Sequence, residues 1–337
     1  MSVSVAIVGP PGSGKTTLFH ALVGGRGSDG VGMVDVPDER LGRLAAAVRP
    51  KRVVPAQVRV ADAPPGSRAQ RIAAAREADV VIKVVRGFGP DPDPGGDLQG
   101  IELDLTLTDL ATVERKLEAV RREVRAGKKQ GAAELAVLER AREHLDEGHA
   151  LATLELDQDS IPLLQPLFPV SAKPSVVIAN VGEDRLPDGG ELAAQVRGLA
   201  GERGWKALVV DAQLEAELAE LEPEDAAAMR GTYGLGGSSL DAVAHAVWEA
   251  GGLITFFTVG EPEVRAWPCD RETPAPTAAG LIHSDFEKNF IRAEVTSVDD
   301  LVGAGSMEAL RAAGRLRVEG RDYRLQEGDV VFFRAGR

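Results

Sequence analysis

The segment that most restricts the fold of this chain is VGPPGSGKTT, at residues 8–17, which begins at the last residue of the apolar run VSVAIV, at residues 3–8. Its spacing, GxxxxGK[ST], is that of the Walker A phosphate-binding loop, which joins a β-strand to an α-helix. Gly9, Gly12, Ser13 and Gly14 allow backbone N–H groups to turn toward phosphates, and the N-terminus of the helix adds a partial positive charge. The motif therefore predicts an α/β P-loop fold with a nucleoside triphosphate site.

Three side chains complete the predicted loop. Lys15 brings a positive charge to the phosphates, and Thr16 offers a hydroxyl oxygen to Mg²⁺, which prefers oxygen ligands. Thr17 follows in the first turn of the helix and is included among the nucleotide-binding residues. The alternative is a glycine-rich turn without a ligand, but strand, spacing and helix together favour the nucleotide site. The motif alone does not separate kinases, ATPases, GTPases and transporters.

Composition narrows the class of protein. The chain has 337 residues, of which 44% are hydrophobic and 27% charged, as in ordinary globular proteins. The one cysteine, Cys269, excludes a disulfide framework, and no apolar run reaches the roughly 18 residues that span a bilayer. Net charge is −13, and residues 151–250 carry 17 acidic against 6 basic side chains. We therefore expect a cytoplasmic protein with no membrane or DNA partner, whose RNA contacts would use local basic patches.

Valine- and isoleucine-rich runs separated by helical segments predict a mostly parallel sheet flanked by helices over the first 250 residues. After Gly251 and Gly252 the sequence pattern changes to short β-like runs in which apolar and polar residues alternate. These runs predict a small mixed β domain. The expected division is a P-loop domain at 1–103 and 151–250, an inserted helical hairpin at 104–150, and a C-terminal domain at 251–337.

The hairpin is predicted from a heptad-like seam, followed by a second apolar helix. The seam comprises Leu110, Val113, Leu117, Val120 and Val124. Lys128 and Lys129 at the tip could contact RNA or an acidic partner, although solvated lysines at a turn are the commoner explanation. The arginines between Arg311 and Arg324 also have two interpretations. They could bind phosphates, or they could face solvent at a domain edge.

Several longer stretches resemble the YchF family of Obg-like ATPases. They are RPKRVVPAQVRVAD at 49–62, NVGED at 180–184, LITFFTVGEPEVRAW at 253–267, and TPAPTAAGLIHSDFEKNFIRAEV at 273–295. The resemblance covers nearly the whole chain. It implies a G domain with a helical insertion, a C-terminal TGS domain of β-grasp type, binding of ATP, and an association with ribosomes and with translation or stress regulation.

The resemblance also assigns the base site. Guanine is usually selected by NKxD, whose Asp accepts hydrogen bonds from the guanine ring, while adenine presents a different donor pattern. Here the corresponding residues are Asn180, Val181 and Glu183, which match the NxxE pattern of the family. The resemblance implies that Asn180 and Val181 belong to the base pocket, that Glu183 marks lost guanine selectivity, and that GTP is the less favoured ligand.

The chain departs from the family pattern around the phosphates. No Thr occurs between Thr17 and Thr106, so the first switch lacks the Thr that would complete the Mg²⁺ shell. The second switch reads DAPPG, with Asp62 and Gly66 one residue too far apart and Pro64 and Pro65 between them. Asp62 still ends a strand beside the loop, so we expect it to contact Mg²⁺ through water. The sequence predicts no catalytic residue.

Two functions follow as hypotheses. The first is a protein that binds ATP with Mg²⁺, hydrolyses it slowly, and acts in a regulatory complex linked to the ribosome. The second is a catalytically degenerate nucleotide-binding or interaction module that acts through its C-terminal domain and hairpin. A third, a small-molecule kinase, would require an acceptor pocket and a lid that the sequence does not reveal.

Overall fold

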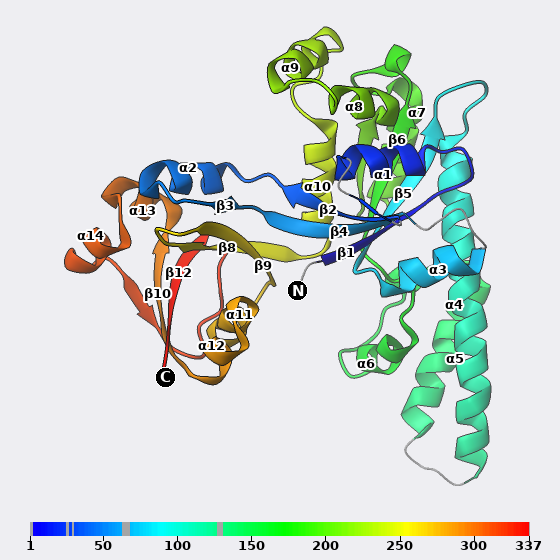
Figure 1. Ribbon diagram of the computed structural model, residues 1–337. Helices are drawn as coiled ribbons and strands as arrows, with labels where there is room; N and C mark the ends of the chain where they lie inside the picture. Colours follow the sequence, from blue (N-terminus) through cyan, green and yellow to red (C-terminus); the bar gives the residue numbers. More distant parts are fainter. Residues whose placement is uncertain (1–2, 25–26, 29, 63–67, 127–130, 337) are drawn as a thin grey trace. The chain divides into compact units, whose positions relative to one another are not determined.

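The computed structural model describes residues 3–24, 27–28, 30–62, 68–126 and 131–336 (Figure 1). Backbone contacts divide the chain into two compact units. One comprises residues 4–33 and 59–250, and the other includes residues 34–58 and 251–337.

The first sheet has six strands in the order β2-β4-β1-β5-β6-β7. The strands are β1 (Val3–Val8), β2 (Val31–Val36), β4 (Ala56–Asp62), β5 (Val80–Gly87), β6 (Ser175–Val181) and β7 (Lys206–Val210). The pairs β1–β5, β5–β6 and β6–β7 are parallel. All seven residues of β6 are buried, as expected for a strand covered on both faces. The predicted P-loop sheet is confirmed.

Helices and short turns connect these strands. The helices are α1 (Lys15–Val23), α3 (Arg68–Glu77), α4 (Pro94–Arg125), α5 (Ala132–Asp146), α6 (Ile161–Leu164), α7 (Gly190–Gly201), α8 (Ala212–Leu218), α9 (Pro223–Thr232) and α10 (Ser239–Ala250). One core cluster lies between the sheet and the helices α4 and α7, and includes Val81, Val177, Leu98 and Val196. In this parallel sheet the carboxyl ends of β1, β5, β6 and β7 share one edge, where ligands of α/β proteins bind.

The predicted helical hairpin is formed by α4 and α5, which run alongside each other in opposite directions (Figure 1). Val113, Leu117 and Val120 of the seam are buried against Leu138 and Ala141 of α5. The first helix begins at Pro94, ten residues before the predicted boundary, because Asp93 caps its N-terminus by accepting a hydrogen bond from the Gly96 N–H. Lys128 and Lys129, expected at the tip, lie outside the described residues.

The second sheet has the order β11-β10-β12-β8-β9-β3. Its strands are β3 (Val53–Val54), β8 (Leu253–Val259), β9 (Val264–Asp270), β10 (Phe290–Ser297), β11 (Arg317–Glu319) and β12 (Asp329–Ala335). The pairs β8–β9 and β10–β12 are antiparallel, whereas β12 and β8 are parallel. If β8 to β12 are numbered 1 to 5 along the chain, their order across the sheet is 2-1-5-3-4, and strands 1 and 5 are parallel. This is the predicted β-grasp arrangement.

The helices of the C-terminal unit are α2 (Glu39–Val48), α11 (Ala275–Ile282), α12 (Ser284–Lys288), α13 (Val298–Ala304) and α14 (Met307–Ala312). Ala275, Ala278 and Ala279 of α11 pack in one core with Phe256 and Phe333 of the sheet. The small alanine side chains of α11 occupy little of this core, and the aromatic rings of the sheet fill the space beside them.

Residues 34–58 differ from the predicted division, which assigned them to the P-loop domain. Val53 of β3 pairs with Val264 of β9, so this segment adds a strand to the C-terminal sheet. Arg40 of α2 forms an ion pair with Glu327 at 2.5 Å, and its guanidinium lies 5.2 Å from the ring centroid of Phe257. The otherwise open edge of β9 gains a partner, an arrangement that no local sequence pattern predicts.

No helix in the described part of the chain is both long enough and apolar enough to cross a membrane.

Candidate nucleotide site

The loop between β1 and α1 has the geometry of a phosphate cradle. Gly12 and Gly14 have φ angles of 76° and 87°, which L-amino acids with side chains rarely adopt. A Cβ at Gly9 would lie 2.3 Å from the carbonyl oxygen of Val84, and one at Gly14 would lie 2.1 Å from Nδ2 of Asn180. Glycine is therefore required both for the backbone turn and for the close packing of the loop on β5 and β6.

Lys15 and Thr16 each form a hydrogen bond that fixes the side chain at the loop. Lys15 Nζ donates a hydrogen bond to the Pro10 carbonyl oxygen at 2.7 Å, which holds the ammonium group across the loop. Thr16 Oγ1 donates to Asp62 Oδ2 at 2.8 Å, so the strand end of β4 is joined to the start of α1. The structure thus brings together Thr16 and Asp62, which are 46 positions apart in sequence, and holds Lys15 against the same loop.

The oxygens of Thr16 and Asp62 fit a magnesium site. Asp62 is 6% exposed, and its second carboxylate oxygen, Oδ1, is buried without a hydrogen-bond partner among the described residues. A buried, unpaired carboxylate oxygen is costly, and a divalent cation offers the compensation that the protein lacks. Hydroxyl and carboxylate oxygens are ligands that Mg²⁺ accepts.

A cavity of about 690 Å³ lies at the carboxyl ends of β5 and β6. Five of the predicted nucleotide-binding residues line it: Gly14, Thr17, Asn180, Val181 and Glu183. The Asn180 side chain donates from Nδ2 to the Ser13 carbonyl oxygen at 2.9 Å, and its Oδ1 accepts from the Ala212 N–H at 3.0 Å. Asn180 therefore connects the phosphate loop to the start of α8.

Val181 and Glu183 differ in their settings. The Val181 residue is only 2% exposed, so it cannot cover a base as the aliphatic stem of a lysine does. The exposed carboxylate of Glu183 accepts a hydrogen bond from the Tyr233 hydroxyl at 2.9 Å, which raises the pKa of that tyrosine. The protein thus engages one of the two carboxylate oxygens of Glu183.

Three residues of this region were not predicted as site residues. Phe88 and Asp211 line the cavity, and Tyr233 contacts Glu183. Asp211 caps α8 by accepting from the N–H groups of Gln213 and Leu214, both at 3.0 Å, and burial raises its pKa. An acidic residue directly after a predicted strand and before a helix was the available signal for Asp211.

The predicted switch residues Pro64, Pro65 and Gly66 lie outside the described residues. We assign no catalytic residue.

Comparisons of this chain with known proteins all lead to one family. The family model YchF-GTPase_C, described as a protein of unknown function, matches residues 253–336. The chain is 35% identical to the "Ribosome-binding ATPase YchF" of Bacillus subtilis (strain 168), across 99% of each chain. It is also 35% identical, with the same coverage, to the protein of that name from Escherichia coli O157:H7.

A solved structure agrees with these relatives. The structure titled "Structure of the Schizosaccharomyces pombe YchF GTPase" superposes with a TM-score of 0.91 at 27% identity. It covers 99% of this chain and 98% of its own. The relatives are named ATPases and the solved protein is named a GTPase, so their names leave the choice of base open.

Proposed function

Because the chain belongs to the YchF family, we propose that it is a cytoplasmic, ribosome-binding P-loop protein that binds ATP with Mg²⁺ and hydrolyses it slowly. The names of the curated relatives support the ribosome and the ATPase activity. The observation that carries the proposal is the contact of Asp62 with Thr16 of the glycine-rich loop that also holds Lys15, with a buried Asp62 oxygen left unpaired among the described residues.

Each part of the loop has a distinct role in this proposal. Backbone N–H groups between Gly9 and Thr17 cradle the phosphates, and Lys15 compensates their charge. Thr16 and Asp62 hold Mg²⁺, Asp62 through water. When bound, the ion neutralises charge that develops on the phosphate oxygens. Hydrolysis is slow because the sequence has no Thr between Thr17 and Thr106 to complete the first switch.

The preference for ATP rests on the base cavity. Val181 occupies the position where an NKxD motif has its lysine, and its burial leaves that face of a base uncovered. Phe88 lines the same cavity and offers an aromatic ring. Glu183 stands where an NKxD motif has its Asp, and one of its two carboxylate oxygens accepts a hydrogen bond from the Tyr233 hydroxyl.

The test of hydrolysis compares phosphate release from ATP by the wild-type protein and by Lys15→Ala. We expect a slow release that is lost in Lys15→Ala, because the phosphates lose their main positive charge. Lys206→Ala is the matched control, since this lysine forms only a surface ion pair with Glu249. Equal release by all three proteins would contradict the ATPase assignment and leave the alternative, a binding module without turnover.

One face of the C-terminal sheet is the surface that we propose for ribosomal RNA. Glu294 of β10 lies directly opposite Val318 of β11 and Phe332 of β12, so these three side chains share a face. Val318 is 65% exposed and Phe332 is 38% exposed. The guanidinium of Arg334 lies 4.2 Å from the Phe332 ring centroid, which makes a platform for an unpaired base.

Three arginines give this face its charge. Arg292, Arg311 and Arg334 all donate to the Glu294 carboxylate, at 3.2, 2.7 and 3.3 Å. Burial raises the pKa of Glu294, but the three guanidiniums outweigh it and lower that pKa to about 2. Three positive charges thus surround one negative charge, and the three arginine side chains are 40–50% exposed, which leaves donors for phosphates.

The other arginines of the predicted cluster do not join this surface. Arg315 pairs with Asp300 and Arg317 with Asp329, while Arg321 and Arg324 donate to backbone carbonyl oxygens. Of the sequence cluster, only Arg311 reaches Glu294.

Binding of a fluorescent single-stranded RNA to the full chain tests this surface. Arg334→Gln should weaken binding and make its salt dependence shallower by about one unit of log–log slope, because one phosphate contact is lost. Arg271→Gln, in the turn after β9, removes the same charge and should leave binding unchanged. Identical salt slopes for both variants would argue against the surface.

A further inference from the structure

The Glu183 carboxylate lies at the base cavity on an exposed turn. Glu183 begins the short 3-10 turn η4 (Glu183–Arg185), which follows β6 and Gly182. The residue is exposed and lines the base cavity. Among the described residues, the Tyr233 hydroxyl is the only hydrogen-bond partner of its side chain, at 2.9 Å. A glutamate has one more rotatable bond than an aspartate, so its carboxylate rotates freely wherever no partner holds it.

Tyr233 is itself held in place by its neighbours. Its ring packs against an apolar cluster between α8 and α9. Three residues earlier, Arg230 of α9 forms an ion pair of 3.0 Å with Glu215 of α8, whose side chain is only 1% exposed. The hydrogen bond to Glu183 raises the pKa of Tyr233, so the hydroxyl keeps its proton and remains a donor at neutral pH. The position of this donor is therefore set by the packing of α8 and α9.

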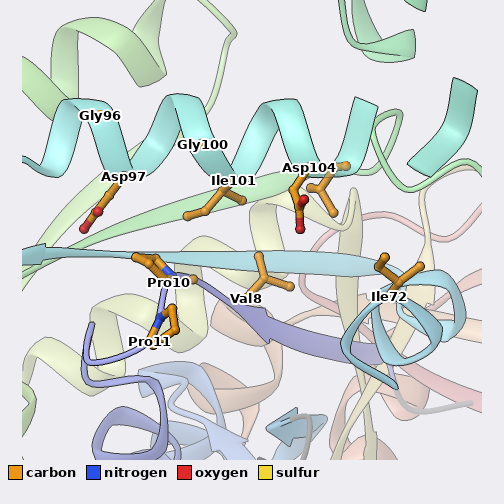
Figure 2. A pocket seen from close by; sticks show the side chains of 11 residues that line it. Val8, Pro10, Pro11, Ile72, Gly96, Asp97, Gly100, Ile101 and Asp104 are labelled. Carbon is orange, nitrogen blue, oxygen red and sulfur yellow. The ribbon is translucent and has the colours of Figure 1, made fainter. Parts of the chain in front are cut away.

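Other residues of the base cavity are fixed more firmly than Glu183. The Asn180 amide forms hydrogen bonds on both of its sides. Phe88 follows the end of β5, where the Arg86 N–H donates to Asp97 Oδ2 of α4 at 2.9 Å. Figure 2 shows the Asp97 side chain directed from α4 toward the sheet, beside the phosphate loop. Glu183 differs from these residues because it is exposed and a single side-chain contact holds it.

We propose that Tyr233 is a positioning residue for base selection, which favours adenine over guanine because it occupies one oxygen of the Glu183 carboxylate. This inference rests on the proposed nucleotide-binding function. In an NKxD motif the Asp carboxylate accepts from both the N1–H and the N2 amino group of guanine, which uses both oxygens. The N6 amino group of adenine requires only one acceptor oxygen. An oxygen already bonded to Tyr233 therefore penalises guanine more than adenine.

The test is calorimetric titration of the full-length, nucleotide-free protein with non-hydrolysable ATP and GTP analogues, each with Mg²⁺. In Tyr233→Phe, we expect the ratio of the GTP-analogue to the ATP-analogue dissociation constant to fall at least about fivefold, because both Glu183 oxygens become available to guanine. A tyrosine that only supported α9 would weaken both analogues equally and leave the ratio unchanged, which would overturn the proposal. Loss of all nucleotide binding in the wild type would instead refute the proposed function, and this inference with it.

The chain has two tyrosines, and the second supplies a matched control. Tyr323 of the C-terminal unit also donates its hydroxyl to a carboxylate, that of Asp329, at 2.7 Å. Tyr323→Phe removes the same atom and should leave the ratio of dissociation constants unchanged.

A double-mutant cycle tests whether Tyr233 acts through Glu183. The carboxamide of Glu183→Gln has one acceptor oxygen, so no second acceptor is released when Tyr233→Phe is added. We expect the double variant and Glu183→Gln alone to differ in their ratios by less than about twofold. The full effect of Tyr233→Phe in the Glu183→Gln background would show a route that does not use the carboxylate, and would overturn the proposal.

NMR of protein labelled with ¹³C at the tyrosine ζ carbon reports on the same contact without a variant at Glu183. The two signals are assigned with Tyr233→Phe and Tyr323→Phe. We expect a saturating ATP analogue to shift the Tyr233 signal, because a base donor on Glu183 changes the hydrogen bond to the phenol, and to leave the Tyr323 signal in place. An unshifted Tyr233 signal would mean that the base does not reach this carboxylate, and would contradict the proposal.

Discussion

At the scale of single residues, the phosphate loop depends on glycine for two different reasons. Gly12 adopts a positive φ, but a Cβ there would meet no atom within 4 Å. Gly14 adopts a positive φ and also lies against the amide of Asn180, which bridges Ser13 and Ala212. A side chain at Gly14 would therefore strain the backbone and displace the residue that fixes the loop to α8.

These two glycines make a matched pair of substitutions. In the absence of nucleotide, Gly12→Ala should lower the free energy of unfolding by about 1 kcal/mol, the cost of a positive φ with a Cβ. Gly14→Ala should lower it by about 2–4 kcal/mol, because the Asn180 hydrogen bonds are lost as well. Urea denaturation of both variants provides the measurement. Equal destabilisation would mean that Asn180 does not hold the loop.

The sequence predicted the parts of the site that lie in one contiguous motif better than the parts that distant segments form together. The loop from Gly9 to Thr17 is contiguous, so its spacing alone predicts strand, turn and helix. The contact between Thr16 and Asp62 required the inference that two strand ends meet at one sheet edge. Phe88 and Tyr233 carry no motif of their own, because their roles arise only when distant segments pack together.

At the scale of elements, α4 is the helix that joins the hairpin to the sheet. Asp109 of α4 is 1% exposed, and its carboxylate accepts from the Val170 N–H at 3.0 Å, the Ser171 N–H at 2.7 Å and the Ser171 hydroxyl at 2.6 Å. Burial raises the pKa of Asp109 despite these hydrogen bonds. The carboxylate fixes the segment before β6 to the base of the hairpin.

Asp109→Ala should therefore lower the free energy of unfolding by about 3 kcal/mol, because two buried N–H groups and a hydroxyl lose their acceptor. Glu114→Ala, on the exposed face of the same helix, should change it by no more than about 0.5 kcal/mol. The urea midpoints of the two variants decide the matter. A loss for Asp109→Ala as small as that of Glu114→Ala would show that the carboxylate contributes no net stability.

The elements were predicted well where one pattern repeats over many residues. The buried strands and the hairpin seam have such patterns. Residues 34–58 do not, because the pairing of Val53 with Val264 depends on an open strand edge more than 200 residues away. The start of α4 at Pro94 was missed because the predicted seam includes only the residues from Leu110 onward. Leu98, Ile101 and Leu105 in the first turns also step by 3 and 4, but they pack in the core with the sheet and not with α5.

At the scale of the whole molecule, charge and function are distributed unevenly. The net charge of −13 disfavours RNA, so contact with a ribosome requires a local excess of positive charge, such as the three arginines around Glu294. The phosphate loop belongs to the other unit. We therefore expect nucleotide binding and RNA binding to be separable by substitution, with Lys15 affecting the first and Arg334 the second.

The central claim is that the chain binds a nucleoside triphosphate at the loop of residues 9–17 and, through the base cavity, prefers ATP to GTP. The most direct test is calorimetric titration of the nucleotide-free protein with non-hydrolysable analogues of ATP and GTP, each with Mg²⁺, on the wild type and on Lys15→Ala. We predict that the ATP analogue binds the wild type at least about tenfold more tightly, a difference of about 1.4 kcal/mol, and that Lys15→Ala binds neither. Tighter binding of the GTP analogue, or unchanged affinity in Lys15→Ala, would contradict the account.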